Sequence, residues 1–293
     1  MKKQIIFKGT ATALITPFSS GKIDYNALER IIEMQINEGV GALVIGGTTA
    51  EAATLSDSER YELFAFTKEK AGGRVKLIFG TGTNDTSAAI KHTKAAERIG
   101  CDGVLVVTPY YNKGTEGGVV KHYLNIADET ALPIILYNVP SRTGVELNFN
   151  QLDILAKKEN IVAIKEASDS ADRLCRVASY GEELTLYAGN DSQIYTTLAL
   201  GGSGVISVLS NILPGVCRDI CQRYFDGECE ASLSIQLKAL SLIRALFRET
   251  NPAPIKYAMS KIGLCKNELR LPLANVCLQT EKEIDTAMGL FGV

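Results

Sequence analysis

The segment IVAIKEAS, residues 161–168, places Lys165 directly after four apolar residues in a stretch typical of a buried strand. Removing an ammonium group from water is costly unless the group is paired or loses its proton. A neutral amine in an apolar site can add to a ketone carbonyl and form a Schiff base. The other interpretation left open is that the lysine extends to solvent or pairs with Glu166 or Asp191.

Schiff-base chemistry also needs a group that donates and accepts protons, and histidine is the usual one. The chain has only two histidines, His92 and His122, and both fall in predicted helices, away from strand ends. Tyr137 ends the apolar segment before the Lys165 strand, so its hydroxyl is a better candidate for proton transfer. The alternative role for Tyr137 is structural, as an aromatic cap on the core.

Two loops contain groups suited to binding small carboxylates. GGTTAEAATL, residues 46–55, offers the hydroxyls of Thr48 and Thr49 and several backbone N–H groups where an apolar segment meets a helix. Arg142 in NVPSRTG can form a bidentate ion pair with a carboxylate. The alternative for the threonine loop is that it only caps its helix. The alternative for Arg142 is that it is a solvated surface charge. The sequence contains no metal-ligand motif and no phosphate loop with the required Lys-Ser/Thr ending.

The segments that must position these residues are short and rich in Val, Ile and Leu, and helix-like segments separate them. There are eight: 10–16, 42–47, 75–82, 103–109, 133–140, 161–167, 184–190 and 204–208. Continuous rather than alternating apolar character predicts strands covered on both faces, and alternation with helices predicts parallel pairing. Among the helices, Ser56 followed by Glu59 fits a capping box.

Eight strand–helix units predict an α/β fold, a closed (β/α)8 TIM barrel with a C-terminal helical extension. We predict a catalytic barrel over residues 1–225 and the extension over residues 226–293. A doubly wound open sheet is the alternative, although no dinucleotide-binding glycine motif follows the first strand. TIM-barrel chemistry takes place at the C-terminal strand ends, and the candidate polar residues fall there.

Composition narrows the class of partner. The chain has 293 residues, 46% hydrophobic and 22% charged, with 31 basic and 33 acidic side chains and a net charge of -2. This balance, without long runs of one sign, indicates neither nucleic acid nor an anionic membrane, so we expect small-molecule partners. The N-terminal residues lack the apolar region of a secretion signal, and the seven scattered cysteines suit a reducing compartment. We therefore expect a cytoplasmic protein.

Seven motifs occur in the order found in the pyruvate-dependent aldolases and lyases. They are FKGTATALITPF, GGTTAEAATLS, GTGTNDT, VTPYYNK, YNVPSRTG, IKEAS and GGSGVISV. From about residue 7 to the C-terminal helices, the chain resembles the dihydrodipicolinate synthase family. The resemblance implies a homotetramer that condenses pyruvate with aspartate 4-semialdehyde on the route to diaminopimelate and lysine. It implies no cofactor, because pyruvate itself binds covalently.

The same resemblance assigns the catalytic residues. Lys165 matches the family's Schiff-base lysine. Tyr137, Thr48 and Tyr111 match its proton relay, in which Tyr111 reaches into the site of the neighbouring subunit. An intact set of these four residues argues against a third kind of function, that of a catalytically inactive barrel that only binds metabolites.

The resemblance also assigns the substrate-binding residues. Thr49 matches the residue that holds the pyruvate carboxylate, and Gly189 and Ile206 match residues that line the pocket. Arg142 matches the arginine that receives the semialdehyde's carboxylate. N-acetylneuraminate lyases are similar through IKEAS but usually lack this arginine, so they and the 2-keto-3-deoxy sugar-acid aldolases remain the alternative enzymes.

This chain departs from the family pattern at two places. Ala50 replaces a glycine after the threonine pair, which predicts a strained or displaced loop if that position needs a positive φ. The second place is where lysine-inhibited members carry histidines and a glutamate. This chain instead has Asp57, Arg60 and Ala88 there, and keeps only Asn84 and Tyr110 of the polar set. We therefore predict weak or absent feedback inhibition by lysine.

Overall fold

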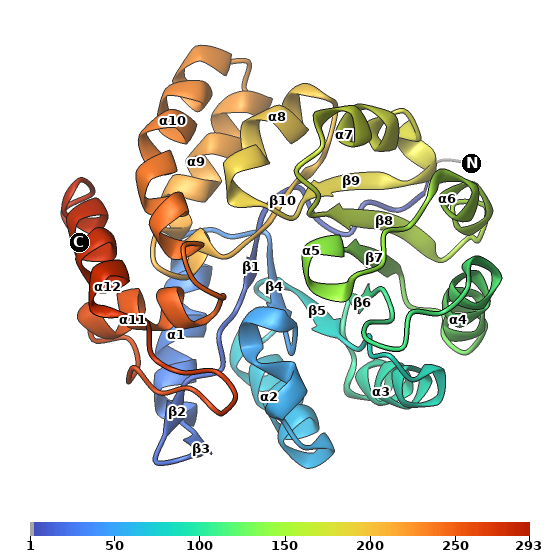
Figure 1. The fold of residues 1–293 in the computed structure, drawn as a ribbon, viewed down its shortest axis with the longest axis horizontal. Helices are drawn as coiled ribbons and strands as arrows, with labels where there is room; N and C mark the ends of the chain where they lie inside the picture. The colour runs from blue at the N-terminus through green and yellow to red at the C-terminus, as the bar shows by residue number, and fades with distance from the viewer. Residues whose placement is uncertain (1–2) are drawn as a thin grey trace.

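Residues 3–293 are described by a computed structural model, in which eight parallel strands close into a barrel (Figure 1). The strands follow the chain order around the barrel. They are β1 (Gly9–Ala13), β4 (Ala42–Ile45), β5 (Lys76–Gly80), β6 (Gly103–Val107), β7 (Ile134–Asn138), β8 (Ile161–Glu166), β9 (Thr185–Ala188) and β10 (Gly204–Ser207). The closed barrel confirms the predicted fold, and the open-sheet alternative is wrong.

Helices connect the strands on the outside of the barrel, as strict alternation predicts. They are α1 (Tyr25–Asn37), α2 (Asp57–Ala71), α3 (Thr86–Ile99), α4 (Glu116–Asp128), α5 (Pro140–Thr143), α6 (Phe149–Leu155), α7 (Ala171–Ala178), α8 (Ile194–Ala199) and α9 (Pro214–Phe225). The capping box predicted from Ser56 and Glu59 begins α2, and Gly72 ends that helix in the left-handed conformation.

Several strands are shorter than their apolar segments. The first apolar segment continues to residue 16, whereas β1 ends at Ala13. Leu14 and Ile15 remain buried after the strand ends, because they pack against the outer core. A small hairpin of β2 (Phe18–Ser19) and β3 (Lys22–Ile23) follows, and the apolar pattern did not predict it. Apolar patterning reports burial, and burial extends beyond the hydrogen-bonded strand.

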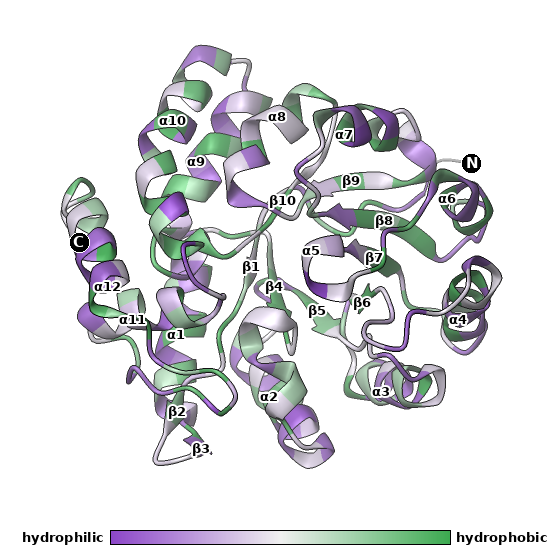
Figure 2. Cartoon of the chain, in the orientation of Figure 1, coloured by the Kyte–Doolittle hydropathy of each residue, from purple (hydrophilic) through white to green (hydrophobic). Residues whose placement is uncertain are grey.

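The core has two layers, because successive side chains of a strand point to opposite faces. Inside the barrel lie residues such as Ala11, Ile78 and Tyr187, and outside it a larger cluster fills the space between strands and helices. In Figure 2, helices such as α2 and α10 carry both hydrophobic and hydrophilic residues. The strands are thus covered on both faces, and their C-terminal ends meet at one mouth.

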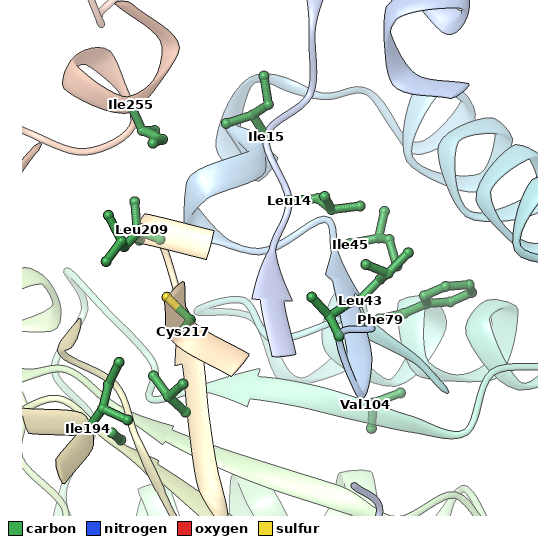
Figure 3. Close-up of a cluster of buried hydrophobic side chains, with 14 of the residues drawn as sticks. Leu14, Ile15, Leu43, Ile45, Phe79, Val104, Ile194, Leu209, Cys217 and Ile255 are labelled. Carbon is green, nitrogen blue, oxygen red and sulfur yellow. The ribbon is translucent and has the colours of Figure 1, made fainter. Parts of the chain in front are cut away.

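The chain ends in three helices on one side of the barrel (Figure 1): α10 (Cys229–Leu246), α11 (Ala253–Lys261) and α12 (Leu278–Gly289). Helix α10 packs against α8 and α9, and α12 packs against α10 and α11. Figure 3 shows Ile255 of α11 beside the same buried cluster as Ile15 and Leu209. The extension therefore shares the barrel's outer core. None of the helices in residues 3–293 is long and apolar enough to cross a membrane.

Candidate active site

Lys165 lies near the C-terminal end of β8 and points into the barrel. Alternation places it on the same face as Ala163, which belongs to the inner core. The residue is 5% exposed, and its Nζ lies 4.3 Å from the centroid of the Tyr137 ring. Strand β7 pairs with β8 so that Tyr137 is opposite Lys165. The structure therefore brings the two predicted catalytic side chains together.

Glu166 is the next residue and points the opposite way, toward α7. Its carboxylate accepts hydrogen bonds from Asn138 Nδ2 at 2.7 Å, Arg173 Nε at 2.9 Å and the Ser168 N–H at 3.0 Å. Burial raises the pKa of Glu166, although Arg173 opposes that shift. The suggestion that Lys165 pairs with Glu166 is wrong. Within residues 3–293, no ion pair or hydrogen bond joins Lys165 Nζ to another group.

Asp191 is a second buried carboxylate at this end of the barrel, just after β9. It is 1% exposed, and its Oδ2 accepts hydrogen bonds from the backbone N–H groups of Val208 at 3.0 Å and Leu209 at 2.9 Å. Burial raises the pKa of Asp191, and the charge of Lys165 acts in the opposite direction. Asp191 thus fixes the loop after β10 and lies within electrostatic range of the lysine.

The threonine pair follows β4 in a 3-10 turn, η1 (Thr48–Ala50). Thr48 is half-buried and Thr49 is 4% exposed. The left-handed residue of this loop is Glu51, with φ of 56°, and Ala50 lies in the turn that precedes it. The expected strain at Ala50 is therefore not found, because the special backbone conformation belongs to the next residue.

Glu51 connects this loop to the C-terminal extension. Its carboxylate forms an ion pair with Lys256 Nζ, and both side chains are fully buried. The other carboxylate oxygen accepts a hydrogen bond from the Arg270 N–H at 2.9 Å. From the barrel side, Thr16 Oγ1 donates to the Ala50 carbonyl at 2.8 Å. The loop carrying the two threonines is thus held on both sides.

Arg142 lies in α5, the short helix after β7, and its side chain is exposed. Its Nη2 donates to the backbone carbonyl of Asn251 at 3.0 Å. The Asn251 side chain in turn donates from Nδ2 to Thr49 Oγ1 at 3.0 Å. Sequence reasoning missed Asn251. It follows no strand, so the rule that places site residues at strand ends could not find it.

Ile206 and Gly189 occupy the ends of β10 and β9. Ile206 is fully buried in the inner core. The Gly189 N–H donates to the Glu166 carbonyl at 2.7 Å, and a Cβ at Gly189 would lie 2.6 Å from the Ala167 Cβ. Glycine is therefore required here by the close approach of β9 to β8, next to the strand that carries Lys165.

Tyr111 follows β6, and the structure leaves it at the surface. Its side chain is 89% exposed and its backbone is left-handed, with φ of 70°. A non-glycine residue in this conformation costs about 1–2 kcal/mol, and such strain gathers at functional sites. Among the described residues, no hydrogen bond joins Tyr111 to Tyr137 or Thr48. A single chain thus brings Lys165 and Tyr137 together but leaves Tyr111, the third predicted relay residue, exposed.

The histidines lie in helices, as predicted. His92 Nδ1 is 3.2 Å from the Tyr61 hydroxyl, and His122 Nδ1 is 2.9 Å from Thr86 Oγ1. Burial lowers the pKa of His122 to about 4. In the part of the chain that the structure describes, no group of three or more His, Cys, Asp or Glu side chains could hold a metal ion.

The sequence model of the dihydrodipicolinate synthetase family matches residues 6–289. The chain belongs to this family. A 4-hydroxy-tetrahydrodipicolinate synthase from Clostridium novyi is 47% identical to it over 92% of each chain. Another, from Clostridium acetobutylicum, is 45% identical over 96% of this chain and 95% of that one. The dihydrodipicolinate synthase structure from Thermotoga maritima has a TM-score of 0.96 at 40% identity and covers 98% of this chain and 99% of its own.

Membership of the dihydrodipicolinate synthetase family makes this chain an enzyme of the lyase type. It confirms the resemblance drawn from the seven motifs. Family membership alone does not assign roles to individual residues. Those roles are argued from the contacts around Lys165, Thr49 and Arg142.

Proposed function

We propose that this chain is a 4-hydroxy-tetrahydrodipicolinate synthase, which condenses pyruvate with aspartate 4-semialdehyde in diaminopimelate and lysine biosynthesis. The observation that carries the proposal is the buried Lys165, placed against the Tyr137 ring and bound by neither neighbouring carboxylate. A lysine in such a place is suited to attack a ketone. The relatives carry the same name.

The reaction begins when the lone pair of Lys165 Nζ adds to the ketone carbon of pyruvate. Tyr137 supplies the proton with which the carbinolamine oxygen leaves as water, giving an iminium ion. The iminium withdraws electrons, so the pyruvate methyl group loses a proton and an enamine forms. The enamine carbon attacks the semialdehyde's aldehyde. Thr48 and the neighbouring subunit's Tyr111 would relay protons to and from Tyr137, and pyruvate bound to Lys165 takes the place of a cofactor.

The substrates' carboxylates have separate binding groups in this proposal. The hydroxyl of Thr49 and the N–H groups of its turn receive the pyruvate carboxylate. The guanidinium of Arg142 receives the carboxylate of the semialdehyde. In this proposal Gly189 and Ile206 line the space between the two carboxylate-binding groups. Gly189 has no side chain, which lets β9 approach β8 closely.

Assembly, location and domain division are part of the same proposal. We propose a homotetramer, as the family resemblance implies; the exposed Tyr111, if it enters a neighbouring site, requires at least a dimer. The odd cysteine count suits the reducing cytoplasm. Residues 1–225 would form the catalytic barrel and residues 226–293 the extension, with α9 ending at Phe225.

Borohydride trapping tests the lysine. Reduction in the presence of pyruvate should convert the imine to a stable amine and leave one pyruvate-derived 1-carboxyethyl group on Lys165, detected by peptide mass. Lys165→Ala should abolish both the adduct and turnover of pyruvate with aspartate 4-semialdehyde. Lys157→Ala, at an exposed lysine, is the matched control and should retain both. An unmodified Lys165 in the active wild-type chain would contradict the mechanism.

Arg142→Ala tests the substrate assignment. We expect the KM for aspartate 4-semialdehyde to rise by about tenfold or more, since a charge-assisted pair is lost, while trapping of pyruvate on Lys165 continues. Arg98→Ala, at an exposed arginine in α3, is the control. Unchanged semialdehyde kinetics in Arg142→Ala, or equal turnover of sugar acids by the wild type, would contradict the assignment.

A further inference from the structure

Asn251 belongs to the turn between α10 and α11, outside every barrel strand, yet it is only 5% exposed. Its Nδ2 donates to Thr49 Oγ1, and its backbone carbonyl accepts from Arg142 Nη2, both at 3.0 Å. Thr49 follows β4 and Arg142 follows β7, and two strands, β5 and β6, separate them around the barrel. One residue of the extension thus joins two sides of the mouth.

The direction of the Asn251–Thr49 hydrogen bond has a chemical consequence. A threonine hydroxyl has one hydrogen and two lone pairs. Because the amide of Asn251 donates, it occupies a lone pair of Thr49 Oγ1 and leaves the hydroxyl hydrogen for another acceptor. The Arg142 bond uses one guanidinium N–H and leaves others for a carboxylate. Both groups therefore keep donors that can meet substrate carboxylates.

We propose that Asn251 is a positioning residue for substrate recognition. Its side-chain amide directs the Thr49 hydroxyl hydrogen toward the pyruvate carboxylate, and its backbone carbonyl holds the Arg142 guanidinium toward the semialdehyde carboxylate. This inference rests on the proposed function and adds to it a role for the C-terminal extension: the extension completes the substrate-binding mouth of the barrel.

The other atom of the Asn251 amide supports a role beyond packing. Its Oδ1 is buried and has no hydrogen-bond partner. Burying an unpaired amide oxygen is costly, so an apolar side chain would fill the same space at lower cost. The donor bond from Nδ2 to Thr49 gives a reason for an amide at this position.

Asn251→Asp tests the direction of the bond. The substitution keeps the shape of the side chain but replaces its donor with a negatively charged acceptor, which attracts the Thr49 hydroxyl hydrogen and repels pyruvate. We expect the KM for pyruvate to rise by about tenfold or more, and the rate of borohydride trapping at low pyruvate to fall in parallel. The KM for the semialdehyde should change by less than about twofold, because the bond to Arg142 comes from the backbone.

A mutant cycle with Asn251→Ala and Thr49→Ala provides a second measurement. Asn251→Ala should raise the pyruvate KM in the wild-type background but add less than about twofold in the Thr49→Ala background, because the two residues act through one bond. Asn160→Asp is the matched control. Asn160 also donates from Nδ2 and has an unpartnered buried Oδ1, but it lies just before β8, at the opposite end of the barrel. It should leave both KM values within about twofold.

Two outcomes would overturn the positioning role. One is an unchanged pyruvate KM in a folded Asn251→Asp chain. The other is an equal rise in both KM values with a lower melting temperature, which is the sign of a purely structural residue. Additive effects in the mutant cycle would also contradict it. A wild-type chain that pyruvate and borohydride do not modify contradicts both proposals, whereas modified wild type with unaffected variants contradicts only the role of Asn251.

Discussion

Adjacent residues of β8 show how alternation separates two kinds of polar group. Lys165 points into the barrel beside Tyr137, and no carboxylate in residues 3–293 forms an ion pair with it. Glu166 points outward and is held by Asn138 and Arg173. Removing one partner of a buried ion pair costs about 3–5 kcal/mol because the other charge is left buried and unpaired, so Glu166 and Arg173 depend on each other. The two charged side chains of one dipeptide thus have different roles.

His122 makes the stability of this chain depend on pH. Burial lowers its pKa to about 4, from an ordinary value of 6.5. Between these pH values the unfolded chain binds a proton and the folded chain does not, so stability is lost as the pH falls below about 6.5. The loss reaches about 3 kcal/mol near pH 4. Urea unfolding at fixed protein concentration should therefore show the gap between wild type and His122→Gln shrinking from pH 7 to pH 4.

His92→Gln is the comparison for this experiment. Burial and the charge of Arg60 also lower the pKa of His92, against the charge of Asp57, but the lowering is smaller than for His122. We expect the corresponding gap for His92→Gln to change less with pH. If wild type and His122→Gln lose stability in parallel over the whole range, the titration of His122 does not control acid stability.

At the scale of elements, the position of Lys165 depends on how closely two strands approach. Strand β9 ends at Ala188, and Gly189 then meets the end of β8 without a side chain between them. Its N–H bonds to the Glu166 carbonyl. A change in this contact would move the end of β8, and a displacement of about 1 Å in a catalytic group can cost about a hundredfold in rate.

Gly189→Ala should therefore lower both activity and stability. Its Cβ would lie 2.6 Å from the Ala167 Cβ and 2.7 Å from the Glu166 carbonyl oxygen, so the strands must separate. We expect about 1–3 kcal/mol of destabilisation from overpacking and slower trapping of pyruvate on Lys165. Gly117→Ala in α4, where no atom lies within 4 Å of the added carbon, is the control. Equal activity of both variants would show that β8 tolerates the displacement.

At the scale of the whole molecule, one chain holds most of the candidate site but not all of it. The extension contacts the threonine loop through the ion pair of Lys256 with Glu51, and it contacts Arg142 through the backbone carbonyl of Asn251. Tyr111, by contrast, is exposed and strained. We therefore propose that a relay that includes Tyr111 uses a second copy of the chain.

Mixing two inactive variants tests whether Tyr111 acts across subunits. Lys165→Ala lacks the proposed nucleophile, and Tyr111→Phe lacks the proposed relay hydroxyl. In a mixed pair, the site with intact Lys165 receives its tyrosine from the Lys165→Ala subunit, so activity should return to roughly a quarter of the wild-type value after equal mixing. No recovery in assemblies shown by mass to contain both subunits would place Tyr111 outside the neighbour's site.

Lysine titration tests the predicted lack of feedback. Asp57 is engaged by Lys91 at 2.6 Å, and Arg60 donates to the carbonyls of Gly80 at 3.1 Å and Ala52 at 2.9 Å. These side chains are already paired within the chain, and Ala88 offers no polar group. We expect most synthase activity to remain at millimolar lysine. A complete block at that concentration would contradict this prediction.

Much of the fold and part of the candidate site could be predicted from the sequence. The eight strands, the Ser56 cap and the placement of Lys165 and Tyr137 on neighbouring strands follow from local patterns, and the structure confirms them. The ends of the strands could not be predicted as well, because Leu14 and Ile15 stay buried after β1 ends. The left-handed conformation expected at Ala50 is instead found at Glu51, because a neighbouring position in a loop can take the special backbone conformation.

The sequence by itself determined which residues stand at the strand ends, because strand period and helix spacing are local properties of the chain. Only the tertiary structure decided that Lys165 contacts Tyr137 and not Glu166, and that Asn251 meets Thr49 and Arg142. Asn251 lies about two hundred residues from Thr49 along the chain. Such a contact depends on how the last helices pack against the closed barrel, and no local pattern encodes that packing.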